Sequence, residues 1–76
     1  MVESAYLRLK NACVDVCENI RDREYDIGLV MDTAEFNAMN VTARRKLSAA
    51  KSALMKADMF ISDFIEHLGY ERRISQ

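Results

Sequence analysis

The fold of this protein is decided by residues 47–68, which read LSAAKSALMKADMFISDFIEHL. In this stretch apolar residues recur at alternating intervals of three and four, at Leu47, Ala50, Leu54, Ala57, Ile61, Phe64 and Leu68. Such spacing places the apolar side chains along one face of an α-helix. Phe36 and Ala43 extend the pattern toward the N-terminus. The stretch therefore predicts a long amphipathic helix.

A second heptad pattern occupies the first part of the chain. Its apolar members are Val2, Tyr6, Leu9, Cys13, Val16 and Ile20. The pattern is interrupted at Arg23 and resumes at Ile27 and Val30. We therefore predict a first helix over about residues 3–31, with these side chains facing the second helix.

The segment between the two patterns has the residues of a turn. Asp32-Thr33-Ala34-Glu35 resembles a capping box, in which an acceptor at the N-cap is followed three residues later by Glu. Residues 32–41 are therefore predicted to form a turn, with or without a short helical segment.

Capping residues predict the bounds of the second helix as residues 43–68. Thr42 is a favourable N-cap residue, and Gly69 stands where a glycine would end the helix. Gly28 is the one residue that offers an alternative, because a glycine there could end the first helix early.

These elements predict an all-α fold consisting of one antiparallel helical hairpin over residues 1–76. In such a hairpin residue i lies near residue 74 − i, so Leu9 would face Ile65 and Cys17 would face Ala57. Two helices cannot cover an apolar stripe this wide, and further apolar residues widen it on the second helix, namely Ala53, Met59, Phe60 and Ile65. We therefore expect the hairpin to assemble into a homo-oligomeric helical bundle.

Composition restricts the class of protein further. Formal net charge is −1, which disfavours a binder of DNA or RNA polymers. No apolar run approaches the roughly 18 residues that a membrane span requires. Residues 1–11 lack the apolar core of a signal peptide, so the sequence predicts a cytoplasmic protein with reduced cysteines.

Residues that could carry catalysis or bind a metal are few. Cys13 and Cys17 share a helix face, but a structural zinc site needs four ligands, and small buried core residues are the better interpretation. His67 has Asp63 one turn before it, yet no nucleophile is recognisably coupled to it. We therefore expect no catalytic residue, no metal site and no cofactor, and hence no enzyme.

The charge pattern of the second helix is unusual. Residues 43–57 hold five basic residues and no acid, and three of them, Arg44, Arg45 and Lys46, lie in the first turn, where acids are normally favoured. Pairing with the acidic residues of the 11–35 stretch is one explanation. The other is a phosphate site, because Arg45 shares a helix face with Ser48 and Ser52.

Residues 45–60 also resemble a known family. They match the pattern R-x-L-S-x-A-x-[TS]-x-L-x-x-A-x-M-[WF] at Arg45, Leu47, Ser48, Ala50, Ser52, Leu54, Ala57, Met59 and Phe60. This is similar to the C-terminal helix of the phage anti-CBASS cyclic-nucleotide sponges, whose helical-hairpin domain is shared with the Thoeris anti-defence sponges. Tyr6-Leu7-Arg8-Leu9 resembles the start of that family's first long helix, and Arg21 stands where the family has Lys.

The resemblance implies a protein that binds cyclic di- or trinucleotide second messengers in the infected bacterial host and does not cleave them. It implies ligand-binding roles for Tyr6, Arg21, Arg45, Ser48 and Ser52. Tyr6 and Arg21 are 15 residues apart, about 22 Å along a helix, so one ligand would contact both only across a subunit boundary. The alternative is a small interaction module that docks a host protein through its apolar helix face.

Overall fold

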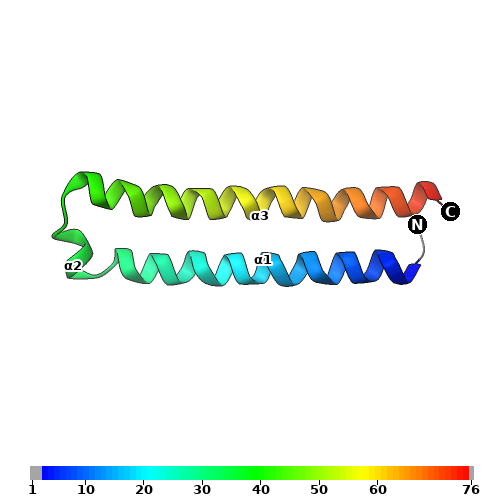
Figure 1. Cartoon of the computed structure of the whole chain (residues 1–76), viewed down its shortest axis with the longest axis horizontal. Helices are drawn as coiled ribbons and strands as arrows, with labels where there is room; N and C mark the ends of the chain where they lie inside the picture. The colour runs from blue at the N-terminus through cyan, green and yellow to red at the C-terminus, as the bar shows by residue number, and fades with distance from the viewer. Residues whose placement is uncertain (1–2, 76) are drawn as a thin grey trace.

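The computed structural model describes residues 3–75, and the side chains of residues 4–71. The chain forms three helices, α1 (Glu3–Met31), α2 (Ala34–Asn37) and α3 (Val41–Ser75). The two long helices lie side by side and antiparallel, and α2 closes one end (Figure 1). The hairpin measures 57 × 16 × 11 Å. The described residues contain no strand, so the prediction of an all-α helical hairpin is confirmed.

The first helix has the predicted bounds, and Gly28 does not interrupt it. No glycine in the described part of the chain has a positive φ. A Cβ atom added to Gly28 would lie 3.6 Å from Nζ of Lys51. A side chain at this position would meet the lysine of the opposing helix only at an ordinary contact distance, and Gly28 does not form a turn.

The turn is capped by two residues that the sequence patterns did not indicate. The hydroxyl of Thr33 accepts a hydrogen bond from the Phe36 amide at 3.2 Å, so Thr33 rather than Asp32 is the N-cap of α2. The side-chain oxygen of Asn40 accepts from the Ala43 amide at 2.8 Å. The prediction of Thr42 as N-cap is therefore wrong, because Asn40 caps α3 two residues earlier.

The predicted end of the second helix at Gly69 is also wrong. α3 continues through Gly69 to Ser75, so that it lies beside the first turns of α1. Leu68 is buried, and a Cβ atom on Gly69 would lie 3.7 Å from the hydroxyl of Tyr6. Packing against α1 therefore outweighs the low helix propensity of one glycine.

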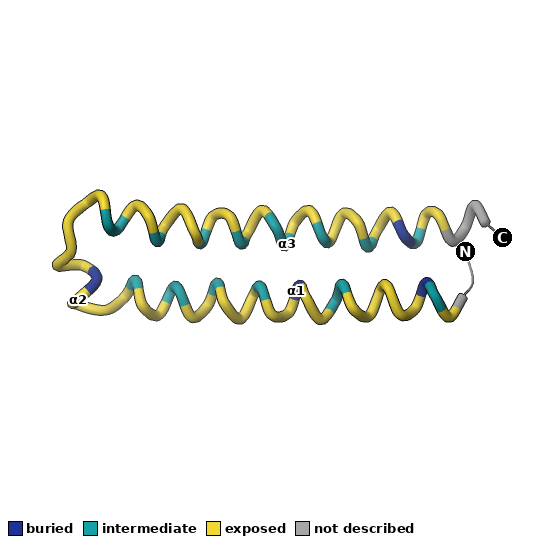
Figure 2. The backbone as a smooth tube through the Cα atoms, viewed as in Figure 1, coloured by how far each residue is buried: buried dark blue, intermediate teal, exposed yellow. Residues whose placement is uncertain are grey.

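The core is a narrow stripe between the two long helices (Figure 2). Four of the described apolar residues are buried, and they are Tyr6, Cys17, Phe36 and Leu68. Sγ of Cys17 lies 4.0 Å from the carbonyl oxygen of Asp58, which confirms the predicted register to within one residue.

The inward face of α1 differs from the predicted one. Leu9 and Val16 remain 43% and 46% exposed, whereas Cys17 is buried and Glu24 is half-buried. One opposing helix can cover only part of a wide apolar stripe, so these two residues lie at its uncovered edge. Val2 lies outside the described residues.

Neither long helix contains an apolar stretch that would span a membrane, within the part of the chain that the structure describes.

Candidate functional site

Arg45, Ser48 and Ser52 lie together on the outer face of α3. Their spacing of three and four residues places them on one side of the helix. All three are exposed, whereas Leu47 and Leu54, which face α1, are half-buried. The structure therefore brings three of the five predicted ligand-binding residues onto one continuous surface.

A cleft of about 290 Å³ opens on this surface at the start of α3. Its lining combines apolar and basic side chains, which are Met31, Phe36, Val41, Arg44, Arg45 and Ser48. Nε of Arg44 is buried and has no hydrogen-bond acceptor. Because the first turn of α3 holds no acid, its free amide groups and both guanidinium groups add to a positive potential.

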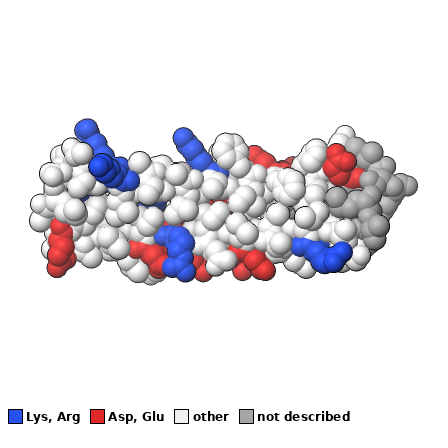
Figure 3. Space-filling view, in the orientation of Figure 1, with Lys and Arg blue, Asp and Glu red and all other residues white. Residues whose placement is uncertain are grey.

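The charge of α3 changes sign along its length. In Figure 3, Lys and Arg stand over the first half of the helix and Asp and Glu over its second half. Among the described residues of α3, the basic side chains are therefore concentrated toward the end of the hairpin that carries the turn, which we call the closed end.

Arg21 lies near the middle of the hairpin and has a partner within the chain. Its Nε donates to Oδ2 of Asp58 at 3.1 Å. This hydrogen bond holds the pKa of the Asp58 carboxyl below its usual value, against the opposite effect of partial burial. Burial raises the pKa of the neighbouring Cys17 thiol. Arg21 uses only its Nε in this pair and its side chain is 60% exposed, so the terminal nitrogens of its guanidinium group could meet a phosphate while the pair with Asp58 persists.

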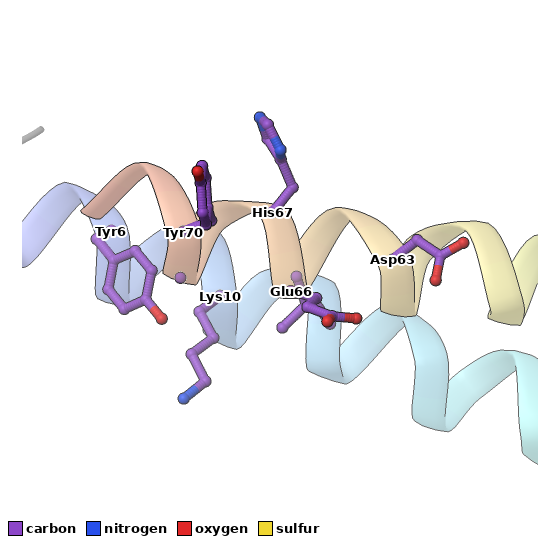
Figure 4. Close-up of a pocket in the computed structure, with 8 residues that line it drawn as sticks. Tyr6, Lys10, Asp63, Glu66, His67 and Tyr70 are labelled. Carbon is purple, nitrogen blue, oxygen red and sulfur yellow. The ribbon is translucent and has the colours of Figure 1, made fainter. Parts of the chain in front are cut away.

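Tyr6 lies at the opposite end of the hairpin, which we call the open end, and only 6% of its surface is exposed. It lines a groove of about 620 Å³ together with Lys10, Asp63, Glu66 and Tyr70 (Figure 4). The two carboxylates of this groove would repel a phosphate. The structure thus separates Tyr6 from Arg21 and from Arg45 within one chain.

The sequence analysis did not assign a binding role to Arg44, and it expected an uncovered apolar face on the second helix without locating the apolar groove. Arg44 joins Arg45 in the cleft, and its spacing of seven from Lys51 and fourteen from Asp58 indicated a polar edge beside the apolar stripe. The apolar groove lies where the two uncovered residues of α1 meet Phe60 and Phe64 of α3. The width of the apolar stripe was the signal for this groove.

The residues considered for metal binding lie apart. Cys17 is buried in the core and Cys13 is half-buried. Nε2 of His67 lies 3.2 Å from Oε1 of Glu71, at the surface. Among the described residues, no group of three or more His, Cys, Asp or Glu side chains could hold a metal ion.

Comparisons of the sequence with protein-family models and with curated proteins, and of the chain with solved structures, found no match.

Proposed function

We propose that this chain is a self-associating protein that binds cyclic di- or trinucleotides and sequesters them without cleavage in the cytoplasm of an infected bacterium. The observation that carries this proposal is the cleft at the closed end, where Arg44 and Arg45 lie beside Ser48 at the start of α3. This is the function implied by the resemblance of residues 45–60 to the phage sponges.

The chemistry of the cleft suits a nucleotide. Guanidinium groups form strong, charge-assisted hydrogen bonds with phosphate oxygens, and hydroxyl groups add further donors. The side chains of Met31, Phe36 and Val41 provide apolar surface for a base or ribose. None of the six lining residues is a carboxylate, histidine or thiol, so the cleft offers no side chain suited to act as a general base.

The size of the cleft favours binding by more than one copy of the chain. Its volume of about 290 Å³ is at the lower limit of ligand sites, which occupy roughly 300–1,000 Å³. A cyclic oligonucleotide also carries at least two phosphates. Arg45 side chains from neighbouring copies would supply one cation to each phosphate. A ligand shared by Tyr6 and Arg21 would need a further contact between copies that brings different levels of the hairpin together.

Titration calorimetry with a panel of cyclic di- and trinucleotides tests the proposal. We expect one class of ligand to bind, and Arg45→Ala to weaken the Kd about tenfold or more, because a hydrogen bond to a charged group contributes about 1.5–3 kcal/mol. Arg23→Ala is the matched control, because Arg23 is an exposed arginine on α1 that pairs with Asp26. Absence of heat with every ligand would sink the proposal.

A second measurement separates sequestration from hydrolysis. The protein is incubated with the ligand that binds, the complex is denatured, and the nucleotide is examined by mass spectrometry. We expect the ligand to be recovered intact, and a linear product in enzyme-dependent amounts would show cleavage instead.

One observation favours the alternative function, an interaction module that docks a host protein. Phe60 is 65% exposed, and with Phe64 it forms an apolar surface that needs no nucleotide to find a partner. A chain that is monomeric and binds none of the cyclic nucleotides would favour this function.

A further inference from the structure

The groove between α1 and α3 at Phe60 and Phe64 differs from the other clefts of the molecule. Its volume is about 290 Å³, and its lining holds no charged residue, consisting of Leu9, Ala12, Cys13, Val16, Phe60, Ile61 and Phe64. The cleft at the closed end and the groove at the open end both contain charged side chains. Removing water from this apolar groove therefore costs less free energy than removing it from either of those two charged clefts.

The area of the chain indicates how much surface remains to be covered. A compact monomer of 8.7 kDa exposes about 4,700 Å². This hairpin exposes 5764 Å², so its excess is about 1,000 Å². A stable protein interface of standard size buries about 800 Å² on each partner. The excess is therefore sufficient for one such interface.

We propose that a second copy of this chain packs on the apolar groove, with both turns at the same end and α1 of each copy against α3 of the other. This arrangement is a four-helix bundle with a twofold axis parallel to its long axis. It specifies the contact face and the orientation of the self-association proposed above, and it does not depend on any nucleotide.

The shapes of the two sides of the groove fit this orientation. A twofold axis along the hairpin repeats the internal register between copies, in which Cys17 lies beside Asp58 and residue numbers add up to 75. Phe60 and Phe64 of one copy would then face residues near 15 and 11 of the other. The small residues Ala12 and Cys13 lie there, so α1 offers space in which the two phenylalanine side chains of the other copy's α3 can pack.

The charges of the two helices favour the same orientation. In this register, residues 43–57 of one copy lie opposite residues 18–32 of the other. The first stretch carries five basic residues and no acid, and most of the charged residues in the second stretch are acidic. The reversed orientation sets residue i of α1 opposite residue 34 − i of the partner's α1, because the numbers of the end residues of this helix, Glu3 and Met31, add up to 34. The acidic stretch would then lie opposite residues 2–16, which carry two acidic and two basic residues. Only the arrangement with both turns together brings the acidic stretch against a basic stretch, so the charges favour it.

Sedimentation analysis of the full chain tests the contact face. We expect a mass of at least twice 8.7 kDa, and Phe60→Gln should weaken self-association at least tenfold. Tyr25→Gln is the matched control, because Tyr25 is an aromatic residue of similar exposure, 68% against 65%, outside the groove. A monomeric parent chain would overturn the proposal and assign the groove to a different protein, and an unchanged Phe60→Gln oligomer would overturn it too.

Circular dichroism shows whether the Phe60→Gln variant still folds, because a folded hairpin retains its helical signal. Should Phe60→Gln unfold, Val16→Gln provides the second variant, since Val16 lines the same groove from α1 and is equally outside the core. We expect the same tenfold loss from it, and no loss would count against the groove.

Spin labels test the orientation. A label on Glu35→Cys marks the closed end of each copy, in a Cys13→Ala background that keeps the groove apolar and with Cys17 buried in the core. If both turns lie at the same end of the dimer, we expect the distance between the two labels to be below half of the 57 Å length of the hairpin. A single distance close to the full length would overturn the proposed orientation.

The outcomes distinguish this proposal from the proposed function. If the chain forms a dimer of the expected geometry but binds no cyclic nucleotide, the proposed docking surface is supported and the sequestration function is contradicted. A monomer that binds cyclic nucleotide with full affinity rejects the docking surface and retains sequestration.

Discussion

The two ends of the hairpin are held together in different ways. At the closed end the chain itself joins the helices, Phe36 is buried, and the side chains of Thr33 and Asn40 cap α2 and α3. At the open end no connection exists, and the helices are held by side-chain packing, with Tyr6 and Leu68 both buried. The closed end therefore depends on local hydrogen bonds, and the open end depends on apolar contacts between residues far apart in sequence.

The ends also differ in electrostatics, and this difference decides where an anionic ligand would bind. The groove at the open end is the larger, at about 620 Å³, but its two carboxylates, Asp63 and Glu66, outnumber its one lysine, Lys10. The smaller cleft at the closed end contains Arg44 and Arg45. A phosphate is attracted by groups of opposite charge and repelled by groups of like charge. The charge of a cleft is therefore a better guide to phosphate binding than its volume.

The largest expected change in the free energy of unfolding comes from Tyr6→Ala, at the open end. Truncation of a buried aromatic residue costs about 3–5 kcal/mol, which would leave a chain of this size largely unfolded. Tyr70→Ala at the same end should cost less than about 0.5 kcal/mol, because Tyr70 is exposed. Thermal unfolding at one protein concentration measures both, and equal midpoints would mean that the open end is not packed as described.

The next effect is at the closed end, from Asn40→Ala. Loss of an N-cap costs about 1 kcal/mol, because the Ala43 amide loses its acceptor. Thr42→Ala should leave stability within about 0.5 kcal/mol, since Thr42 caps nothing. Urea unfolding compares the two variants, and a larger cost for Thr42→Ala would restore the prediction from sequence that Thr42 begins the helix.

Gly69→Ala tests the open end with the opposite sign. Because Gly69 is inside α3 and has no positive φ, alanine should stabilise the hairpin by about 0.5–1 kcal/mol. The added methyl would meet the Tyr6 hydroxyl at an ordinary contact distance of 3.7 Å. A fall in the unfolding midpoint would indicate that Gly69 ends the helix after all.

The smallest effect concerns the Arg21–Asp58 pair, between the two ends. The pKa of Asp58 is lowered in the folded chain, so its contribution to stability is present above about pH 4, the ordinary value for Asp, and is lost as the pH falls through the folded pKa. Asp58→Asn should therefore destabilise the protein at pH 6 and have less effect at pH 2.

The complementary variant, Arg21→Gln, checks the assignment of this pH dependence. It should reproduce the effect of Asp58→Asn at pH 6, and the double variant should lose little more, because both changes remove one interaction. Additive losses would show that Asp58 is stabilised by something other than Arg21.

Local chemistry explains which sequence predictions failed. Thr42 and Gly69 are favourable capping residues by composition, but Asn40 reaches the Ala43 amide first, and packing of α3 on α1 carries the helix past Gly69. For the candidate site, spacing alone placed Arg45, Ser48 and Ser52 on one face. Spacing also predicted that Tyr6 faces the second helix, but it could not show that Arg21 pairs with Asp58, because this contact joins residues far apart in the chain.

The sequence by itself determined the all-α class and the first helix, because heptad spacing is a local property that each helix carries without its partner. The turn residues determined the place of the turn, and that place set the approximate register of the two helices. Only the tertiary structure decided which part of each apolar stripe is covered. Leu9 and Val16 belong to the same pattern as Tyr6, yet Tyr6 is buried and they are not. A single opposing helix covers a limited width, and the uncovered remainder forms the apolar groove on which we propose that a second copy packs.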